Sequence, residues 1–122
     1  VTQSRTMVFN GTTFDRVRGD TTNGMDVDVT RLPTSTGGGA ANVASSATNV
    51  TLLASNTARK GATITNDSTA ILYVKFGATA SATSYHVKMD AGSYLEVPFG
   101  YTGIIDGIWT SANGSARVGE FT

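Results

Sequence analysis

The sequence predicts an all-β protein, in which an extended N-terminal β-arm precedes a single antiparallel β-sandwich, jelly-roll-like or immunoglobulin-like. Three observations predict this class. Seven short β-prone segments follow one another at roughly 8–12-residue spacing, with turn residues between them. Thr, Ser, Asn and Gly carry the polarity, since only 15% of the residues are charged, and these residue types favour strands and turns. No stretch of helical length repeats apolar residues every 3.6 positions.

The first 42 residues form the predicted arm. Two β-prone runs, 6–9 and 12–17, flank Asn10-Gly11, a strong hairpin signal because both turn residues tolerate positive φ. Residues 25–30 then alternate strictly between apolar and polar side chains, which is typical of a half-buried strand. A β-ribbon of this size is too small to bury an apolar face alone. The arm is therefore expected to pack on the main domain, on a second copy or on another protein.

The stretch 33–41, PTSTGGGAA, predicts a flexible tether, because three consecutive glycines and their small neighbours have no side chains to bury. The sandwich domain is expected to follow it at 43–122. Its strands are predicted at 49–54, 61–66, 70–76, 84–89, 93–97, 103–109 and 116–121. Within these strands large apolar residues alternate with polar ones, so each strand is expected to have one buried face.

Charge and residue usage exclude several classes of function. Nine basic and nine acidic residues give a net charge of zero, which argues against nucleic-acid binding by phosphate attraction. Without cysteine and with His86 as the only histidine, we expect no metal site, no cofactor and no catalytic nucleophile with its base, and hence no enzyme. No run of about 18 apolar residues predicts a membrane span. Asp20, Asp26 and Asp28 could supply oxygens to calcium, but the EF-hand loop pattern is absent.

Aromatic residues leave one binding hypothesis open. Tyr85, Tyr94, Tyr101 and Trp109 could form a platform on which a sugar ring stacks, and Tyr101 and Trp109 lie near predicted turns. Such residues also fill the cores of small sandwiches. The two interpretations differ in whether Trp109 is exposed.

The segment 10–33, NGTTFDRVRGDTTNGMDVDVTRLP, resembles a module found in virion proteins of tailed bacteriophages. The shared features are an aromatic residue at Phe14, the D-R-x-R-G-D run at 15–20, the T-x-N-G turn at 21–24 and the D-V-D-V strand at 26–29. Two stretches of the main region, 59–66 and 91–98, are similar to small phage structural domains.

This resemblance implies a protein of the virion that assembles rather than catalyses. We therefore expect a capsid decoration (cement) protein, a homotrimer, bound to the major capsid protein or to other virion proteins by its arm. The alternatives are a receptor- or glycan-binding module of a tail fibre or spike, with a host surface glycan as ligand, and a tail or neck adaptor. The expected partner-binding residues are Phe9, Phe14, Arg16, Arg18, Asp20, Asp26, Val27, Asp28 and Val29.

Overall fold

The computed structural model describes residues 7–9, 14–16, 19–20, 24–25 and 33–122, in two compact units that divide between Leu32 and Pro33. Two short antiparallel pairs lie in the first unit. They are β1 (Met7–Phe9) with β2 (Phe14–Arg16), and β3 (Gly19–Asp20) with β4 (Gly24–Met25). The first pair occupies the place of the expected hairpin, whereas most of the strand expected at 25–30 lies outside the described residues.

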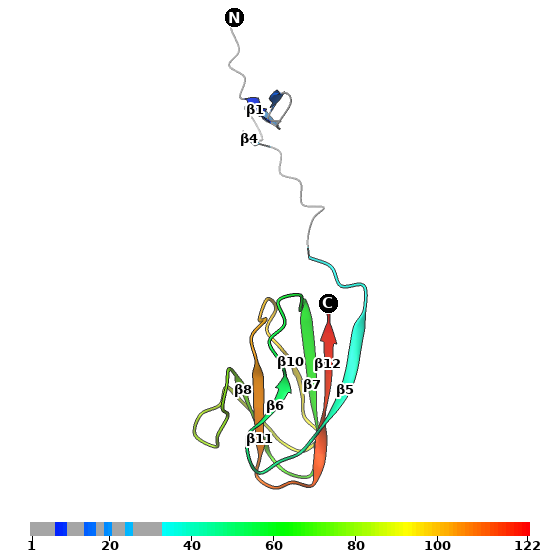
Figure 1. The fold of residues 1–122 in the computed structure, drawn as a ribbon, viewed down its shortest axis with the longest axis vertical. Helices are drawn as coiled ribbons and strands as arrows, with labels where there is room; N and C mark the ends of the chain where they lie inside the picture. Colours follow the sequence, from blue (N-terminus) through cyan, green and yellow to red (C-terminus); the bar gives the residue numbers. More distant parts are fainter. Residues whose placement is uncertain (1–6, 10–13, 17–18, 21–23, 26–32) are drawn as a thin grey trace, which may run out of the picture. The chain divides into compact units, whose positions relative to one another are not determined.

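The second unit is an all-β sandwich of two four-stranded antiparallel sheets (Figure 1). One sheet has the order β10-β7-β12-β5 and the other β6-β11-β8-β9. Their strands are β5 (Gly38–Ala44), β6 (Val50–Leu53), β7 (Gly61–Ser68), β8 (Leu72–Phe76), β9 (Val87–Met89), β10 (Tyr94–Glu96), β11 (Ile105–Trp109) and β12 (Gly114–Phe121). Residues 33–122 contain no helix, so the predicted all-β class is confirmed. Only β8 and β9 are consecutive strands paired in one sheet, and every other connection from β5 to β12 crosses between the sheets.

All seven strands predicted for the domain are present, but the structure adds an eighth. Residues Gly38–Ala44 form β5, so the prediction of a flexible tether is wrong from Gly38 onward. Gly, Ala and Asn have low β-propensity, and β5 forms because β12 pairs with it along its whole length, from Gly38 opposite Phe121 to Ala44 opposite Ser115. The compact unit accordingly begins at Pro33 rather than at the predicted residue 43.

The core lies between the two sheets. On β7 the side chains of Ala62, Ile64 and Asn66 are buried, while the residues between them are half-buried, which is the alternation of a strand with one face inward. The opposite sheet contributes Leu72, Val74, Met89, Ile105 and Trp109. Burying a Leu, Ile or Val side chain contributes roughly 1.5–3 kcal/mol, so this cluster supplies most of the driving force for folding.

One polar side chain in this core links the two sheets. Asn66 of β7 has no exposed surface, and its amide nitrogen donates to the carbonyl oxygens of Ala70, Met89 and Asp90 at 2.8–3.1 Å. Its side-chain oxygen accepts hydrogen bonds from Ser68 Oγ at 2.7 Å and from Trp109 Nε1 at 3.1 Å. Because these bonds satisfy the amide, its burial does not carry the penalty of an unpaired polar group.

Two glycines provide a matched test of how the sandwich is packed. A methyl group at Gly39 would have nothing within 4 Å, whereas one at Gly114 would lie 2.5 Å from the carbonyl oxygen of Asp67. We expect Gly39→Ala to raise the free energy of unfolding by about 0.4–1 kcal/mol, because it lowers the conformational entropy of the unfolded chain and causes no clash in the folded one. Gly114→Ala should lower that free energy by roughly 1–3 kcal/mol. Urea denaturation measures both, and equal effects of the two substitutions would contradict the structure.

Candidate protein–protein interface

The solvent-facing side of the β10-β7-β12-β5 sheet, called the outer face below, is hollowed by small residues. Gly119 of β12 lies opposite Ala40 of β5 and Thr63 of β7, and a methyl group at Gly119 would approach Thr63 Oγ1 to 2.7 Å. The missing side chain leaves a shallow hollow of about 480 Å³. Its lining is formed by Gly38, Gly39, Ala40, Ala41, Asn42, Thr63, Thr65, Arg117, Val118, Gly119 and Phe121.

A second shallow hollow of about 480 Å³ adjoins the first and shares Thr63 and Phe121 with it. It is also lined by Lys60, Gly61, Ala62, Glu96, Val97 and Phe99. Phe99 is 75% exposed and Phe121 is 40% exposed. The Phe121 ring lies over Gly38, since a methyl group there would be 2.5 Å from the ring. Two exposed phenylalanines beside a shallow surface of small residues are suited to contact with another protein.

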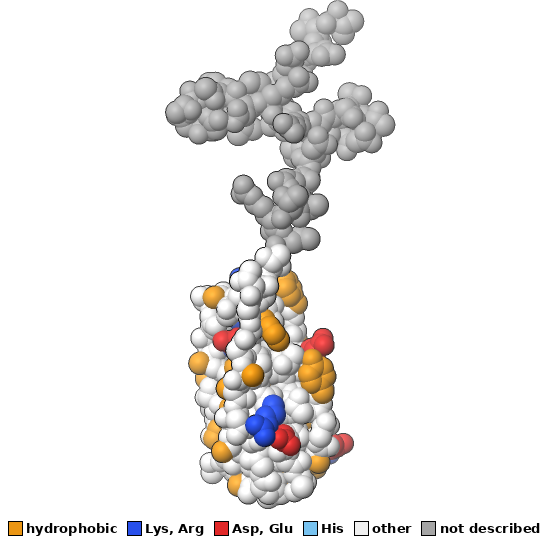
Figure 2. All heavy atoms as spheres, turned by 90° about the vertical axis from the view of Figure 1, so that its right-hand side faces the viewer, with side chains coloured by type: hydrophobic (Ala, Val, Ile, Leu, Met, Phe, Trp, Pro, Cys, Tyr) orange, Lys and Arg blue, Asp and Glu red, His pale blue; other side chains and the backbone are white. Residues whose placement is uncertain are grey.

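The outer face has little net charge. Its Arg117 Nε lies 2.9 Å from Asp67 Oδ2, and both side chains are more than half exposed. An exposed ion pair of this kind contributes about 0–1 kcal/mol and is screened by salt. In Figure 2, where the β5 side of Figure 1 faces the viewer, hydrophobic side chains form separate patches on a mostly uncharged surface. A partner would therefore be recognised here by shape and apolar contact more than by charge.

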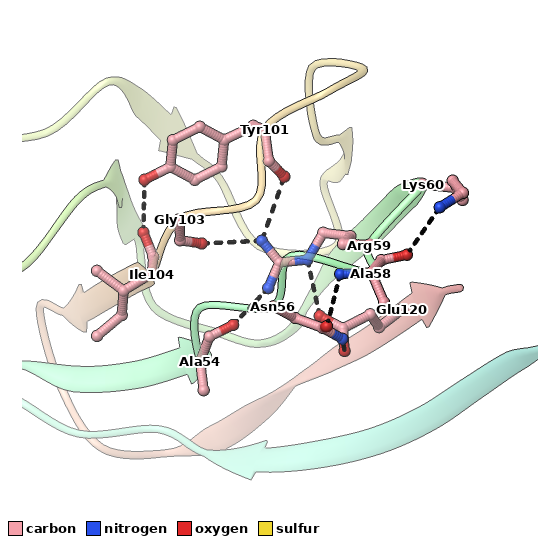
Figure 3. A network of polar contacts seen from close by, with 9 residues as sticks. All are labelled: Ala54, Asn56, Ala58, Arg59, Lys60, Tyr101, Gly103, Ile104 and Glu120. Carbon is pink, nitrogen blue, oxygen red and sulfur yellow. Dashed lines mark hydrogen bonds and ion pairs between the residues drawn. The ribbon is translucent and has the colours of Figure 1, made fainter. Parts of the chain in front are cut away.

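A buried arginine holds the loops beside Phe99 and Phe121 in place (Figure 3). The Arg59 side chain is 1% exposed, and its Nε donates to Glu120 Oε2 at 2.7 Å. Its Nη1 donates to the carbonyl oxygen of Gly103 at 2.8 Å and its Nη2 to that of Ala54 at 2.5 Å. Asn56 Nδ2 donates to the other oxygen of Glu120 at 2.8 Å. These bonds fasten the β6–β7 and β10–β11 loops to the end of β12.

The pKa of Glu120 reflects this network. Burial acts to raise the pKa, but hydrogen bonds from Asn56 and Arg59, together with the positive charge of Arg59, outweigh it. The pKa of Glu120 therefore lies below its ordinary value of 4.5. A carboxyl whose pKa is lowered by folding contributes stability that is complete above the unfolded pKa and is lost as the pH falls through the folded one.

Glu120→Gln tests this network. At neutral pH we expect the free energy of unfolding to fall by about 3 kcal/mol, because the buried Arg59 guanidinium loses its counter-charge. The wild type should lose part of its stability as the pH falls below about 4.5, and the variant should lack that part. Urea denaturation at a series of pH values measures both. Asp67→Asn, which removes the charge paired with exposed Arg117, is the control and should change stability by about 0–1 kcal/mol.

Of the two roles considered for Trp109, the structure shows the core role, because its side chain is 2% exposed and its Nε1 donates to Asn66 Oδ1. Tyr101 is half-buried against the core, where its hydroxyl donates to the carbonyl oxygen of Ile104 at 2.7 Å. Its ring packs against Phe76, with 5.5 Å between the centroids. Tyr101 and Trp109 are therefore not presented to solvent as stacking surfaces, whereas Tyr85 and Tyr94 of the predicted platform are 40% and 59% exposed.

Within residues 33–122 the exposed aromatic residues are Tyr85, Tyr94, Phe99 and Phe121, of which Phe99 and Phe121 were not predicted as site residues. A signal for Phe99 existed in the sequence Pro98-Phe99-Gly100, since Pro and Gly mark a turn. Gly100 indeed has φ +84, a backbone conformation that glycine adopts at no steric cost. The turn places Phe99 at a loop tip.

Trp109→Phe separates a core role of this side chain from a ligand-binding role. We expect the free energy of unfolding to fall by roughly 1–3 kcal/mol, because Asn66 loses one hydrogen-bond donor and the smaller ring leaves a gap. Tyr94→Phe, at a side chain that is 59% exposed, should change it by no more than about 0.5 kcal/mol. Chemical denaturation measures both variants. A Trp109 variant as stable as wild type would show that the indole is not part of the core.

The structure places only some of the predicted partner-binding residues of the arm. Phe9 of β1 lies opposite Phe14 of β2. Arg16 is the last residue of β2, and Asp20 is the last residue of β3. The other five, Arg18, Asp26, Val27, Asp28 and Val29, lie outside the described residues. The arrangement of these nine side chains therefore stays a prediction.

Two further polar clusters of the domain serve loops rather than a site. His86 Nδ1 accepts a hydrogen bond from the backbone N–H of Phe76 at 3.1 Å, and its ring stacks on that of Phe76. Asp106 is buried and accepts from the Thr79 N–H at 2.7 Å and from Asn49 Nδ2 at 3.0 Å. Among the residues that the structure describes, no three His, Cys, Asp or Glu side chains gather as metal ligands, and no helix could cross a membrane.

Comparison with known proteins finds no matching family model, no matching curated protein and no matching solved structure.

Proposed function

We propose that this chain is a non-enzymatic structural protein of a virus particle, a capsid decoration (cement) protein that its N-terminal arm anchors to the shell. The observation that carries the proposal is the outer face of the sandwich. It is shallow, little charged and bordered by Phe99 and Phe121, as suits contact with another protein more than with a small substrate. The resemblance of 10–33 to a phage virion module supports the location on a virion.

We further infer that the sandwich is a jelly roll. Eight strands arranged as β5-β12-β7-β10 and β6-β11-β8-β9, with crossing connections throughout except at β8–β9, have the arrangement that two Greek keys produce. Jelly rolls occur in viral capsid proteins and also in lectins. The strand order therefore supports a virion protein without separating a decoration protein from a glycan-binding one.

The side chains favour the decoration protein over the glycan-binding module. Of the four residues of the expected glycan platform, Trp109 is buried and Tyr101 is half-buried with its hydroxyl bonded to Ile104, which leaves only Tyr85 and Tyr94 exposed. A tail or neck adaptor would need the same kind of protein contact as a decoration protein. The partners we propose are further copies of the chain, as a homotrimer, and the major capsid protein or another virion protein.

Removal of the arm tests this function. A chain beginning at Pro33 retains all of β5, whereas one beginning at Ala41 would lose the strand's first three residues. We expect the 33–122 chain to fold and to give the circular dichroism spectrum of a β-protein, because its core is complete, yet not to sediment with purified capsids that bind the full chain. Equal binding of the two chains would contradict the arm as anchor and would direct the search to the outer face.

Two substitutions in the full chain sharpen this experiment. Truncation of a buried aromatic anchor costs about 2–4 kcal/mol of binding, whereas loss of an ion pair at the rim of an interface costs about 0–1 kcal/mol. Phe14→Ala is therefore expected to weaken capsid binding far more than Asp28→Ala. A larger effect of Asp28→Ala would show that a buried charge pair, not an aromatic side chain, anchors the arm.

A further inference from the structure

The β5 strand is an unusually open sheet edge. The two sheets have four edge strands, β5, β10, β6 and β9. Three are short, with three or four residues, and two of these carry a charged residue, Lys88 in β9 and Glu96 in β10. Short length and charge are the usual protections of an edge against pairing with another chain. The β5 strand has seven residues, with neither charge nor proline.

Within residues 33–122, the glycines in β5 and directly before it make few contacts, with one exception. Gly38 makes room for the Phe121 ring. Gly37 and Gly39 have nothing within 4 Å of an added methyl group, and neither has a φ in the left-handed region. Glycine inside a strand weakens it, and a common reason for its presence is the close approach of another backbone. Within residues 33–122 nothing occupies the space of a Cβ at Gly39, so no contact of this domain explains why the position is a glycine.

The absence of charge indicates which backbone would fit. In a two-fold symmetric contact each strand meets its own copy in the antiparallel direction, so any charged residue near the axis would face the same charge. The residues Gly38–Ala44 contain none, and the chain has no net charge. The exposed side chains of β5 are those of Ala40, Ala41, Asn42 and Ala44, and none carries a charge that would meet its own copy across the axis.

We propose that β5 pairs with β5 of a second copy across a two-fold axis, which joins two β10-β7-β12-β5 sheets into one of eight strands. Backbone hydrogen bonds along seven residues hold the pair, and the hollows of the two outer faces become neighbours. The area is small beside the roughly 1,200–2,000 Å² of a standard stable interface. The contact is therefore weak in dilute solution and strengthens when copies are concentrated. The pairing is separate from the proposed arm contacts and from the proposed homotrimer, which a two-fold contact cannot build, so each of these contacts can fail without the others.

Cysteine cross-linking of the full chain tests the pairing, because the protein has no native cysteine. With the axis at Ala41, the middle of β5, two copies of Ala41→Cys would lie directly opposite. Opposed Cα atoms in an antiparallel pair are about 4.5–5.5 Å apart, within the range of a disulfide. We expect Ala41→Cys to form dimers under mild oxidation roughly tenfold or more faster than Ala82→Cys, an exposed loop alanine that serves as the matched control.

The direction of pairing has its own signature. Ala40→Cys and Asn42→Cys should cross-link with each other when mixed, faster than either does alone, because an antiparallel pair centred at 41 places 40 opposite 42. In the cysteine-free chain, Ala41→Lys should lower the sedimentation coefficient at high protein concentration, because it brings two like charges together at the axis, while Ala82→Lys should not. Cross-linking at β5 no faster than at Ala82→Cys, or no preference for the mixed pair, would overturn the proposal.

Discussion

The antiparallel pairing of β12 with both β5 and β7 is the constraint on which the rest of the domain depends. The β12 strand is the last of the described strands in sequence order, yet it pairs with β7 along eight residues and with β5 along seven. Without it, β5 has no partner in the domain, β7 keeps only β10, and the outer face does not exist. The fold can therefore form only when distant parts of the chain meet. Proteins dominated by such contacts between residues far apart in sequence fold slowly.

Buried polar bonds then fix what this pairing brings together. The Asn66–Trp109 bond joins the two sheets across the core, and Arg59 fastens two loops to Glu120 on β12. Both groups bond to atoms distant in sequence, so their desolvation is compensated only in the complete fold. Their position also explains how Phe99 can remain exposed on a loop, since the loop is held from its buried side by Arg59.

Side-chain patterns made much of the fold predictable, and their absence explains the failures. The seven predicted strands alternate large apolar residues with polar ones, as in Leu72, Val74 and Phe76. The β5 sequence has almost no side chains to alternate, so no period-2 pattern could reveal it. A core role for Trp109 was among the interpretations of the sequence, but its hydrogen-bond partner was inaccessible, because the accepting amide of Asn66 lies 43 residues away. At the candidate interface, the hollow depends on Gly119 lying between Ala40 and Thr63, a juxtaposition that exists only after three strands have paired.

The strand β5 could not be predicted because it has few large side chains, and its lack of charge also suits it to the proposed pairing between copies. A strand of Gly, Ala and Asn contributes little to the core, since of its residues only Val43 packs against the buried cluster. A long uncharged edge is also a risk for aggregation. A more apolar strand would contribute more to the core, and an exposed lysine would lower the risk of aggregation. The cost in stability and solubility is physically reasonable if, as we propose, the edge is covered in the assembled state, where an uncharged strand can pair with its own copy. The composition of β5 is thus better explained by contact between copies than by the needs of a single chain.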